Sequence, residues 1–332
     1  MKILITGGNG NISWWFVELA IKYGHQIYVL NRNASKPTRR NFPTEVIRIS
    51  CDYRNFKETQ EAIKKYNFDV VCDFICYNQQ EAKQAIELFK NKTRHYILIS
   101  SESIYQRKTK YLPFKENTPL NDPKKSGKYI AGKIEAETEL KKAFENFAFP
   151  LTIIRPAYTY DTILPTSIGM TCFTAVNRYM LDKTALLAGD GMNLRTFTHS
   201  RDFARALLGV IGNHNAIGED FHITTDEWLT WNDTTEIIVQ HLHIQNPKII
   251  HIPREKIFSF ELLGDADILD QKMSHNIFDN SKIKKLLPTW SAQIGFQEGI
   301  RETLDWLFED TIRQRINLSL DALILNITKD FR

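Results

Sequence analysis

A tyrosine and a lysine four residues apart are the pair in this chain best spaced for proton-transfer chemistry. Tyr129 and Lys133 lie in the run KYIAGKIEAETELKKAF, which has few helix-breaking residues and predicts a helix. On a helix, side chains at these two positions leave the same face one turn apart. A phenol titrates at about pH 10, and an ammonium group about 4–6 Å away favours the phenolate. The pair could exchange a proton with a substrate hydroxyl, although this spacing also occurs on ordinary amphipathic helices.

A serine-rich strand end offers a third reactive group. The run RHYILISS predicts a strand, and it continues into Ser101, Glu102 and Ser103. Ligands of open parallel sheets bind beyond the carboxyl ends of the strands. Ser101 can therefore orient a substrate hydroxyl or carbonyl oxygen toward Tyr129. Serine at a strand end is also ordinary turn chemistry, so the tyrosine helix that follows is what favours the functional interpretation.

The elements that must position these groups begin with a glycine-rich loop. Residues 2–6 form a short β-branched run without polar alternation, which is typical of a strand buried on both faces. The loop GGNGNIS at residues 7–13 follows, and then the apolar helical stretch WWFVELAIKYG. Such a turn lets backbone N–H groups approach a pyrophosphate at a helix N-terminus. We therefore predict a dinucleotide-binding loop whose contacts are Gly7, Gly10, Asn11 and Ile12.

The second strand, HQIYVLNRN, ends in Asn31 and Arg32. Sites that hold an unphosphorylated ribose usually carry an acid here, and that acid would repel a 2′-phosphate. Arg32 would instead attract a 2′-phosphate, with help from Lys36, Arg39 or Arg40. We expect an NAD(P) cofactor, with NADP preferred, at a site that includes Asn31 and Arg32.

Strands and helices alternate through residues 1–157, which predicts an α/β fold with a Rossmann-type doubly wound parallel sheet. Asp52, after the third strand, is placed to accept from an adenine amino group or to cap the next helix. The alternation becomes less regular in residues 158–310, where we expect a smaller mixed α/β substrate lobe interleaved with the last sheet elements. Residues 311–332 form a C-terminal extension whose apolar stripe predicts docking on its own domain or on a second subunit.

Composition excludes several classes of protein. The chain has 332 residues, 42% hydrophobic and 25% charged, as is ordinary for a soluble globule. The net charge of +4 is small and its basic residues are scattered among acids, so nucleic acid is not favoured as a partner. The four cysteines lack metal-type spacing, so we expect buried thiols and no metal site. No apolar run reaches the roughly 20 residues that span a bilayer, which predicts a cytoplasmic protein without membrane contact.

Taken in order, the motifs resemble the extended short-chain dehydrogenase/reductase superfamily, in its NAD-dependent epimerase/dehydratase branch that acts on nucleotide sugars. The resemblance runs from residue 1 to about residue 310. Its motifs are TGGNGNIS, Asp52 after the third strand, LISSESIY, Tyr129 with Lys133, IIRPAYTY, GDGMNLRTFTHSRDFARAL at residues 189–207 and FQEGIRETLDWL at residues 296–307. Each motif is weak alone, and their order and spacing together are specific.

The resemblance implies a role for each matching residue. Tyr129 would be the acid/base, and Lys133 would lower the pKa of Tyr129 and hydrogen-bond the nicotinamide ribose. Ser101 matches the catalytic serine or threonine. Arg195 falls where relatives bind the diphosphate of a nucleotide sugar, which a guanidinium fork suits. We count Ser103 among the substrate contacts, and we expect a homodimer.

Departures from the family pattern bear on the reaction type. Ser13 stands where the third loop glycine is usual, which predicts looser helix-to-sheet packing while still allowing a small side chain. Sugar 4,6-dehydratases of this superfamily carry an acid where this chain has Ser103, and here Glu102 is one residue earlier. Elimination of water then lacks a positioned acid. We therefore rank a nucleotide-sugar epimerase or ketosugar reductase above a 4,6-dehydratase.

Two further readings stay open. Atypical relatives, including chloroplast RNA-binding proteins, keep the fold without clear sugar chemistry. The basic residues that would serve such a role are Arg107, Lys108, Lys110, Lys124, Lys125 and Lys128, which a solvated active-site rim also explains. Retention of Ser101, Tyr129 and Lys133 favours the enzyme, because a binding protein does not need all three. The third reading is a reductase of a non-nucleotide ketone, against which Arg195 argues.

Some residues in the second half have a structural interpretation that we prefer. His199 and Asp202, which follow Arg195, are expected to make a helix-entry hydrogen bond or cap. Trp228 and Trp231 could stack on a base, and core packing is the better explanation for both.

Overall fold

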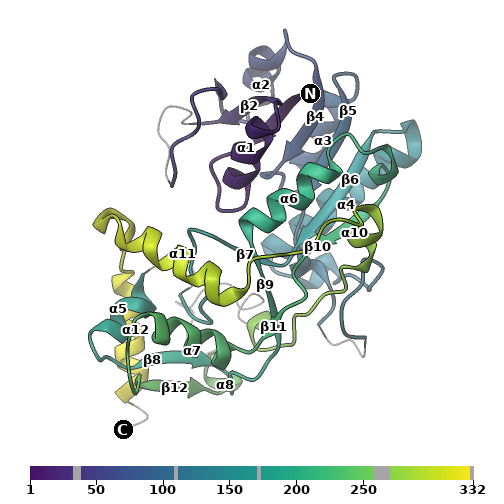
Figure 1. Ribbon diagram of the computed structural model, residues 1–332. Helices are drawn as coiled ribbons and strands as arrows, with labels where there is room; N and C mark the ends of the chain where they lie inside the picture. The colour runs from purple at the N-terminus through teal and green to yellow at the C-terminus, as the bar shows by residue number, and fades with distance from the viewer. Residues whose placement is uncertain (33–38, 108–110, 170–172, 258–269, 330–332) are drawn as a thin grey trace.

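Seven parallel strands form the main sheet of the computed structural model, which describes residues 1–32, 39–107, 111–169, 173–257 and 270–329 (Figure 1). Their spatial order is β10-β6-β5-β4-β1-β2-β3, and every neighbouring pair is parallel. The strands are β1 (Lys2–Thr6), β2 (Gln26–Asn31), β3 (Ile47–Ser50), β4 (Phe68–Asp73), β5 (Thr93–Ile99), β6 (Leu151–Pro156) and β10 (Asp220–Ile223).

Helices cover both faces of this sheet. They are α1 (Ser13–Lys22), α2 (Phe56–Ile63), α3 (Gln79–Phe89), α4 (Lys128–Phe147) and α6 (Ser200–Val210). Apolar side chains of α1 and α6 share one core cluster with the sheet, and those of α3 and α4 share another on the opposite face (Figure 1). The apolar runs predicted as strands are thus buried from both sides. The predicted doubly wound α/β fold is confirmed.

A smaller lobe lies below the main sheet in the view of Figure 1. It holds a three-stranded sheet ordered β11-β9-β7 and a parallel pair, β8 with β12. Its strands are β7 (Tyr158–Tyr160), β8 (Ala185–Ala188), β9 (Arg195–His199), β11 (Trp228–Leu229) and β12 (Ile249–Ile252). Its helices are α5 (Thr174–Met180), α7 (Trp231–His241), α8 (Arg254–Ile257), α11 (Phe296–Phe308) and α12 (Leu318–Lys329). α10 (Ser281–Leu286) instead packs beside β10, so segments of the second half return to the main sheet.

Short 3-10 turns complete the described elements. They are η1 (Glu102–Ile104), η2 (Pro123–Lys125), η3 (His214–Ala216) and η5 (Thr311–Arg313). Trp231 is fully buried in the core of the smaller lobe, as expected, whereas Trp228 is 42% exposed. No helix among the described residues has the length and apolar content required to cross a bilayer.

The C-terminal extension docks on its own lobe, which is the first of the two alternatives predicted for it. Leu320, Ile324 and Ile327 of α12 pack in one cluster with apolar residues of β8 and β12. Asp321 accepts a hydrogen bond from the buried Arg178 of α5 at 2.5 Å, which fixes the helix by charge as well as by apolar contact.

One buried carboxylate holds the strand ends together where the sheet carries its loops. Asp73, at the end of β4, is fully buried and accepts hydrogen bonds from Thr6 Oγ1 at 2.7 Å, Tyr53 Oη at 2.6 Å and Tyr96 Oη at 2.7 Å. It also accepts from the Ile75 N–H at 3.0 Å. Burial of a carboxylate is tolerated only when its oxygens are satisfied in this way.

Asp73→Asn should lower the free energy of unfolding by about 2–4 kcal/mol, because an amide nitrogen or a neutral oxygen would face two phenol donors. Denaturant titration measures this change. Glu61→Gln is the matched control, because Glu61 is exposed and pairs with Lys64 on the surface. Equal stability of the two variants would contradict the role given to Asp73.

Candidate active site

Two adjoining clefts lie at the carboxyl ends of the parallel strands. The first, of about 410 Å³, contains the predicted cofactor residues Gly7, Gly10, Asn31, Arg32 and Asp52. The second, of about 640 Å³, is lined by Gly7, Gly10, Asn11, Ile12, Ser101, Ser103, Tyr129 and Arg195, all of them predicted site residues, together with others. Both clefts share Gly7, Gly10, Ile75 and Tyr77, so they form one continuous crevice. The predicted residues are therefore brought together, with the exception of Lys133.

The glycine loop has the geometry of an anion cradle. Gly7 has φ +74°, and a Cβ there would lie 2.5 Å from Ile75 Cγ2, so only glycine fits. The N–H groups of Asn11 and Ile12, at the N-terminus of α1, make no hydrogen bond within the described part of the chain. Free N–H groups at a helix N-terminus suit a pyrophosphate. The residues present therefore fit a dinucleotide.

Ser13 tightens this loop. Its hydroxyl donates to Gly7 O at 2.7 Å and accepts the Gly10 N–H at 2.9 Å. The loop thus accommodates the small side chain, which is buried and closes the loop internally.

The side chain of Asn11 is used inside the protein. Its Nδ2 donates to Thr159 O at 2.8 Å, and its Oδ1 accepts from the N–H groups of Thr162 at 3.0 Å and Ile163 at 3.2 Å. This amide joins the glycine loop to the segment after β7. The backbone N–H of Asn11 remains available to contact a cofactor.

The ribose end of the crevice carries Arg32 and Asp52. Arg32 is exposed on the lining of the first cleft, beside Asn31 at the end of β2. Asp52 Oδ1 accepts the Arg54 N–H at 3.1 Å, whereas Asn55 caps α2. Asp52 is therefore a turn residue on the cleft lining, and the helix-cap alternative is wrong.

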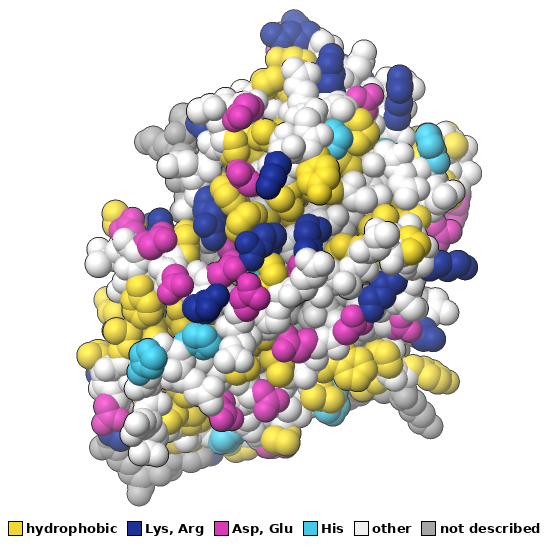
Figure 2. All heavy atoms as spheres, viewed as in Figure 1, with side chains coloured by type: hydrophobic (Ala, Val, Ile, Leu, Met, Phe, Trp, Pro, Cys, Tyr) yellow, Lys and Arg dark blue, Asp and Glu magenta, His cyan; other side chains and the backbone are white. Residues whose placement is uncertain are grey.

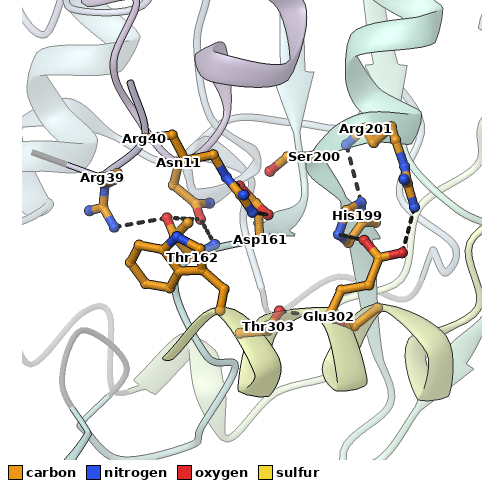
Figure 3. Close-up of polar contacts among 12 residues, drawn as sticks. Asn11, Arg39, Arg40, Asp161, Thr162, His199, Ser200, Arg201, Glu302 and Thr303 are labelled. Carbon is orange, nitrogen blue, oxygen red and sulfur yellow. Dashed lines mark hydrogen bonds and ion pairs between the residues drawn. The ribbon is translucent and has the colours of Figure 1, made fainter. Parts of the chain in front are cut away.

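The basic residues expected to help Arg32 lie elsewhere. Arg39 donates to Thr162 Oγ1 at 3.0 Å, and Arg40 pairs with Asp161 at 2.7 Å (Figure 3). Both reach toward the smaller lobe and away from the end of β2. Lys36 lies outside the described residues.

Tyr129 and Ser101 meet in the second cleft. Ser101 Oγ lies 2.9 Å from Ser103 Oγ and also caps η1. Desolvation raises the pKa of Tyr129, a hydrogen bond with Ser101 acts in the opposite direction, and the charge of Glu102 raises the pKa further. Tyr129 is 38% exposed, so a substrate can reach it.

The ammonium group of Lys133 is bound by backbone carbonyls. Its buried Nζ donates to Cys76 O and Ile99 O, each at 2.9 Å, and lies 4.5 Å from the centre of the Tyr77 ring. Burial lowers the pKa of Lys133, while neighbouring anionic groups raise it. The groups that shift the pKa of Tyr129 in this structure are Ser101 and Glu102, besides burial, and Lys133 is not among them, so the expectation that Lys133 lowers this pKa is not met here.

Arg195 stands at the far end of the second cleft. Its Nη1 donates to Gln271 O at 2.9 Å, and its guanidinium lies 5.0 Å from the Trp231 ring. Its buried Nε has no hydrogen-bond partner among the described residues. Burial lowers the pKa of Arg195 to about 10. A buried donor without a partner suits an anionic or carbonyl ligand.

Glu102, a carboxylate on the lining of the second cleft, forms an ion pair. Glu102 bonds the buried Arg107 and also accepts from Asn276 Nδ2 at 3.0 Å. Arg107 was expected on a basic surface, and that expectation is wrong, because this residue is buried. Lys108 and Lys110 lie outside the described residues, whereas Lys124, Lys125 and Lys128 are exposed.

The structural interpretation of His199 and Asp202 is confirmed. His199 Nδ1 accepts the Arg201 N–H at 3.2 Å and so caps α6 (Figure 3). Burial lowers the pKa of His199 to about 3. Asp202 accepts from the N–H groups of Gln293 at 2.9 Å and Ile294 at 2.8 Å.

The family model that matches this chain is that of the NAD dependent epimerase/dehydratase family, over residues 3–224. The chain belongs to this family. The resemblance drawn from the motifs is thereby confirmed, at the level of the family.

Relatives of the chain within and around the family are distant. The chloroplast stem-loop binding protein of 41 kDa b from Arabidopsis thaliana is 25% identical, over 98% of this chain and 84% of its own length. The UDP-N-acetyl-alpha-D-glucosaminuronate decarboxylase of Bacillus cytotoxicus is 24% identical, over 93% of this chain and 98% of its own.

Solved structures share the fold over nearly the whole chain. The dTDP-glucose 4,6-dehydratase of Bacillus anthracis, in complex with NAD, has a TM-score of 0.74 at 20% identity and covers 93% of this chain and 97% of its own. The UDP-glucuronic acid 4-epimerase of Bacillus cereus, in complex with UDP-glucuronic acid and NAD, has a TM-score of 0.73 at 19% identity and covers 93% and 99%.

The sequence alone did not identify Tyr77, Gln271 and Lys272, which also line the crevice. Tyr77 lines both clefts, its ring centre is 6.3 Å from that of Tyr129, and burial raises its pKa to about 12. Its position after the fourth strand was the signal that could have identified it. Lys272 and Gln271 reach the second cleft from a segment far along the chain, and no local pattern marks them.

Gly132→Ala should lower both stability and cofactor affinity. A Cβ at Gly132 would lie 2.3 Å from Tyr77 O, so α4 would have to move away from the loop that lines both clefts. The alanine would gain about 1 kcal/mol in helix propensity. The steric cost should exceed this gain and leave a net loss of about 1–3 kcal/mol in the free energy of unfolding. Thermal unfolding and cofactor titration measure the two effects. Glu135→Ala, at an exposed position of the same helix, should change neither.

Proposed function

We propose that this protein is an NAD(P)-dependent enzyme that epimerises or reduces a nucleotide-linked sugar. The observation that carries the proposal is the placement of Tyr129 and Ser101 on a chamber that is continuous with the glycine-loop cleft. A cofactor in the first cleft and a sugar in the second would meet beside the Tyr129 hydroxyl. A binding protein gains nothing from such an arrangement.

Each residue has a defined task in this proposal. The bound nicotinamide would supply the hydride chemistry at a sugar carbon. Tyr129 would move the proton of the sugar hydroxyl, and Ser101 would orient that hydroxyl through its own hydrogen bond. Lys133, held by Cys76 O and Ile99 O, would fix α4 and hence the position of Tyr129. The raised pKa of Tyr129 keeps its phenol protonated, which suits a proton donor to a ketosugar.

The far end of the chamber favours an anionic substrate group. Arg195 and Lys272 line it, and the Arg195 Nε is unsatisfied among the described residues. A diphosphate or a carboxylate would satisfy such donors. Relatives named for UDP-linked and dTDP-linked sugars support a nucleotide sugar as the substrate class.

The second candidate is RNA binding, which the stem-loop binding relative suggests through its 25% identity across 98% of this chain. The exposed Lys124, Lys125 and Lys128 could meet phosphates. Burial of Arg107 against Glu102 removes one cation from that surface. We therefore rank RNA binding below the enzyme.

Tyr129→Phe should reduce turnover by about 100-fold or more, which is the usual contribution of a general acid or base. A panel of UDP- and dTDP-sugars, with nicotinamide absorbance and product analysis as readouts, provides the assay. Cofactor affinity should be retained. Tyr23→Phe is the control, because Tyr23 is 70% exposed at the end of α1. Unchanged turnover in Tyr129→Phe would remove the proposed acid/base, and wild-type protein that binds stem-loop RNA but no nicotinamide would favour the second candidate.

Arg32→Ala should weaken NADP binding about tenfold and leave NAD binding nearly unchanged, because only NADP offers a 2′-phosphate to the guanidinium. Calorimetric titration of both cofactors measures this ratio. An equal loss for NAD and NADP would show that Arg32 does not read the 2′-phosphate.

A further inference from the structure

Arg39 occupies an unexpected position for a residue of the segment between β2 and β3. It is half-buried and lines the second cleft together with Gly10, Asn11, Ile12 and Ser13. Arg39 therefore lines the same cleft as the glycine loop and the N-terminus of α1. Its neighbour Arg40 does not line this cleft.

The two arginines differ in how their charges are compensated. Arg40 binds Asp161 through two hydrogen bonds, at 2.7 and 3.3 Å, and lies 5.1 Å from the Trp14 ring. Among the described residues, Arg39 donates a hydrogen bond to the neutral Thr162 Oγ1, which lies 3.4 Å from Asn11 Oδ1 (Figure 3). Asp161 is already bound by Arg40. Arg39 is thus partly desolvated and bonds a neutral group, and the charge that compensates it, Asp161, is shared with Arg40. Such a partly compensated charge favours a further anion.

The surroundings show that cations are normally paired in this part of the molecule. Figure 2 shows Lys and Arg side chains interspersed with Asp and Glu in the middle of the face where α11 passes below α1 and α6. Arg201 pairs with Glu302 there at 2.7 Å (Figure 3). Desolvation lowers the pKa of Arg39, in keeping with its position on the cleft wall.

We propose that Arg39 binds the pyrophosphate of the dinucleotide, opposite the free N–H groups of Asn11 and Ile12. The inference rests on the proposed function, because it needs a dinucleotide in the crevice. A guanidinium fork can bond two phosphate oxygens at once. The contact would also link the cofactor to the smaller lobe, since Arg39 bonds Thr162 and Arg40 bonds Asp161.

Loss of Arg39 and loss of Arg32 should then change the affinities for NAD and NADP in different ways. The pyrophosphate is common to NAD and NADP, whereas the 2′-phosphate belongs to NADP alone. Loss of Arg39 should weaken both cofactors by the same factor, and loss of Arg32 should weaken NADP selectively.

The experiment is calorimetric titration of the full-length protein with NAD and with NADP at two salt concentrations. Arg39→Gln should weaken both cofactors about tenfold or more and reduce the salt dependence of binding, as loss of a charge-assisted phosphate contact requires. Arg39→Lys should recover part of the affinity. Arg40→Gln is the matched control, because it disturbs the same segment without touching the cleft. It should lower the unfolding temperature and leave the affinity for both cofactors nearly unchanged.

Each other outcome overturns the assignment. Unchanged binding in Arg39→Gln, or a loss confined to NADP, would remove Arg39 from the pyrophosphate. An equal loss in Arg40→Gln would show that the segment acts only as a scaffold. Wild-type protein that binds neither cofactor would overturn the proposed function itself, which separates that failure from a failure of this inference alone.

Discussion

The buried carboxylate of Asp73 is the constraint on which the crevice depends. Its hydrogen bonds join the end of β1 through Thr6, β5 through Tyr96 and the loop after β3 through Tyr53. The segments after β1, β3 and β4, which line the cofactor cleft, leave the sheet next to these contacts. A carboxylate in an apolar interior is stable only with its donors in place, so the strand ends cannot drift independently. The hydrogen bonds of Asp73 therefore fix the positions of these strand ends relative to one another.

A second constraint acts on the helix that carries the tyrosine. Because residue 132 is glycine, α4 approaches the loop after β4 so closely that Lys133 reaches Cys76 O and, on β5, Ile99 O. The ammonium thus ties one helix to two strand ends. This geometry explains why Tyr129 is positioned accurately while its pKa is governed by desolvation and by Ser101. In the described state Lys133 is better understood as a positioning residue than as an electrostatic partner of the phenol.

The sequence predicted what local patterns encode. Alternating apolar runs predicted the doubly wound sheet, and the strand ends correctly placed Gly7, Asn31 and Asp52 on one crevice. It could not predict where polar side chains point when their partners are distant. Asn11 bonds residues about 150 positions away, and Arg107 is buried by Asn276, 169 positions away. Such contacts depend on how the smaller lobe packs against the main sheet. The spacing of residues within one segment does not reveal that packing.

The proposed reaction type rests on which groups of the chamber remain available. Glu102 is the acid beside Tyr129, but Arg107 and Asn276 already occupy its two carboxylate oxygens. A base for elimination needs an oxygen free to take a proton from carbon. Tyr129 retains an accessible hydroxyl, with Ser101 as its hydrogen-bond partner. Proton movement at a sugar hydroxyl, coupled to hydride transfer, is thus the chemistry that these side chains can perform, and it is the chemistry of the proposed epimerase or reductase.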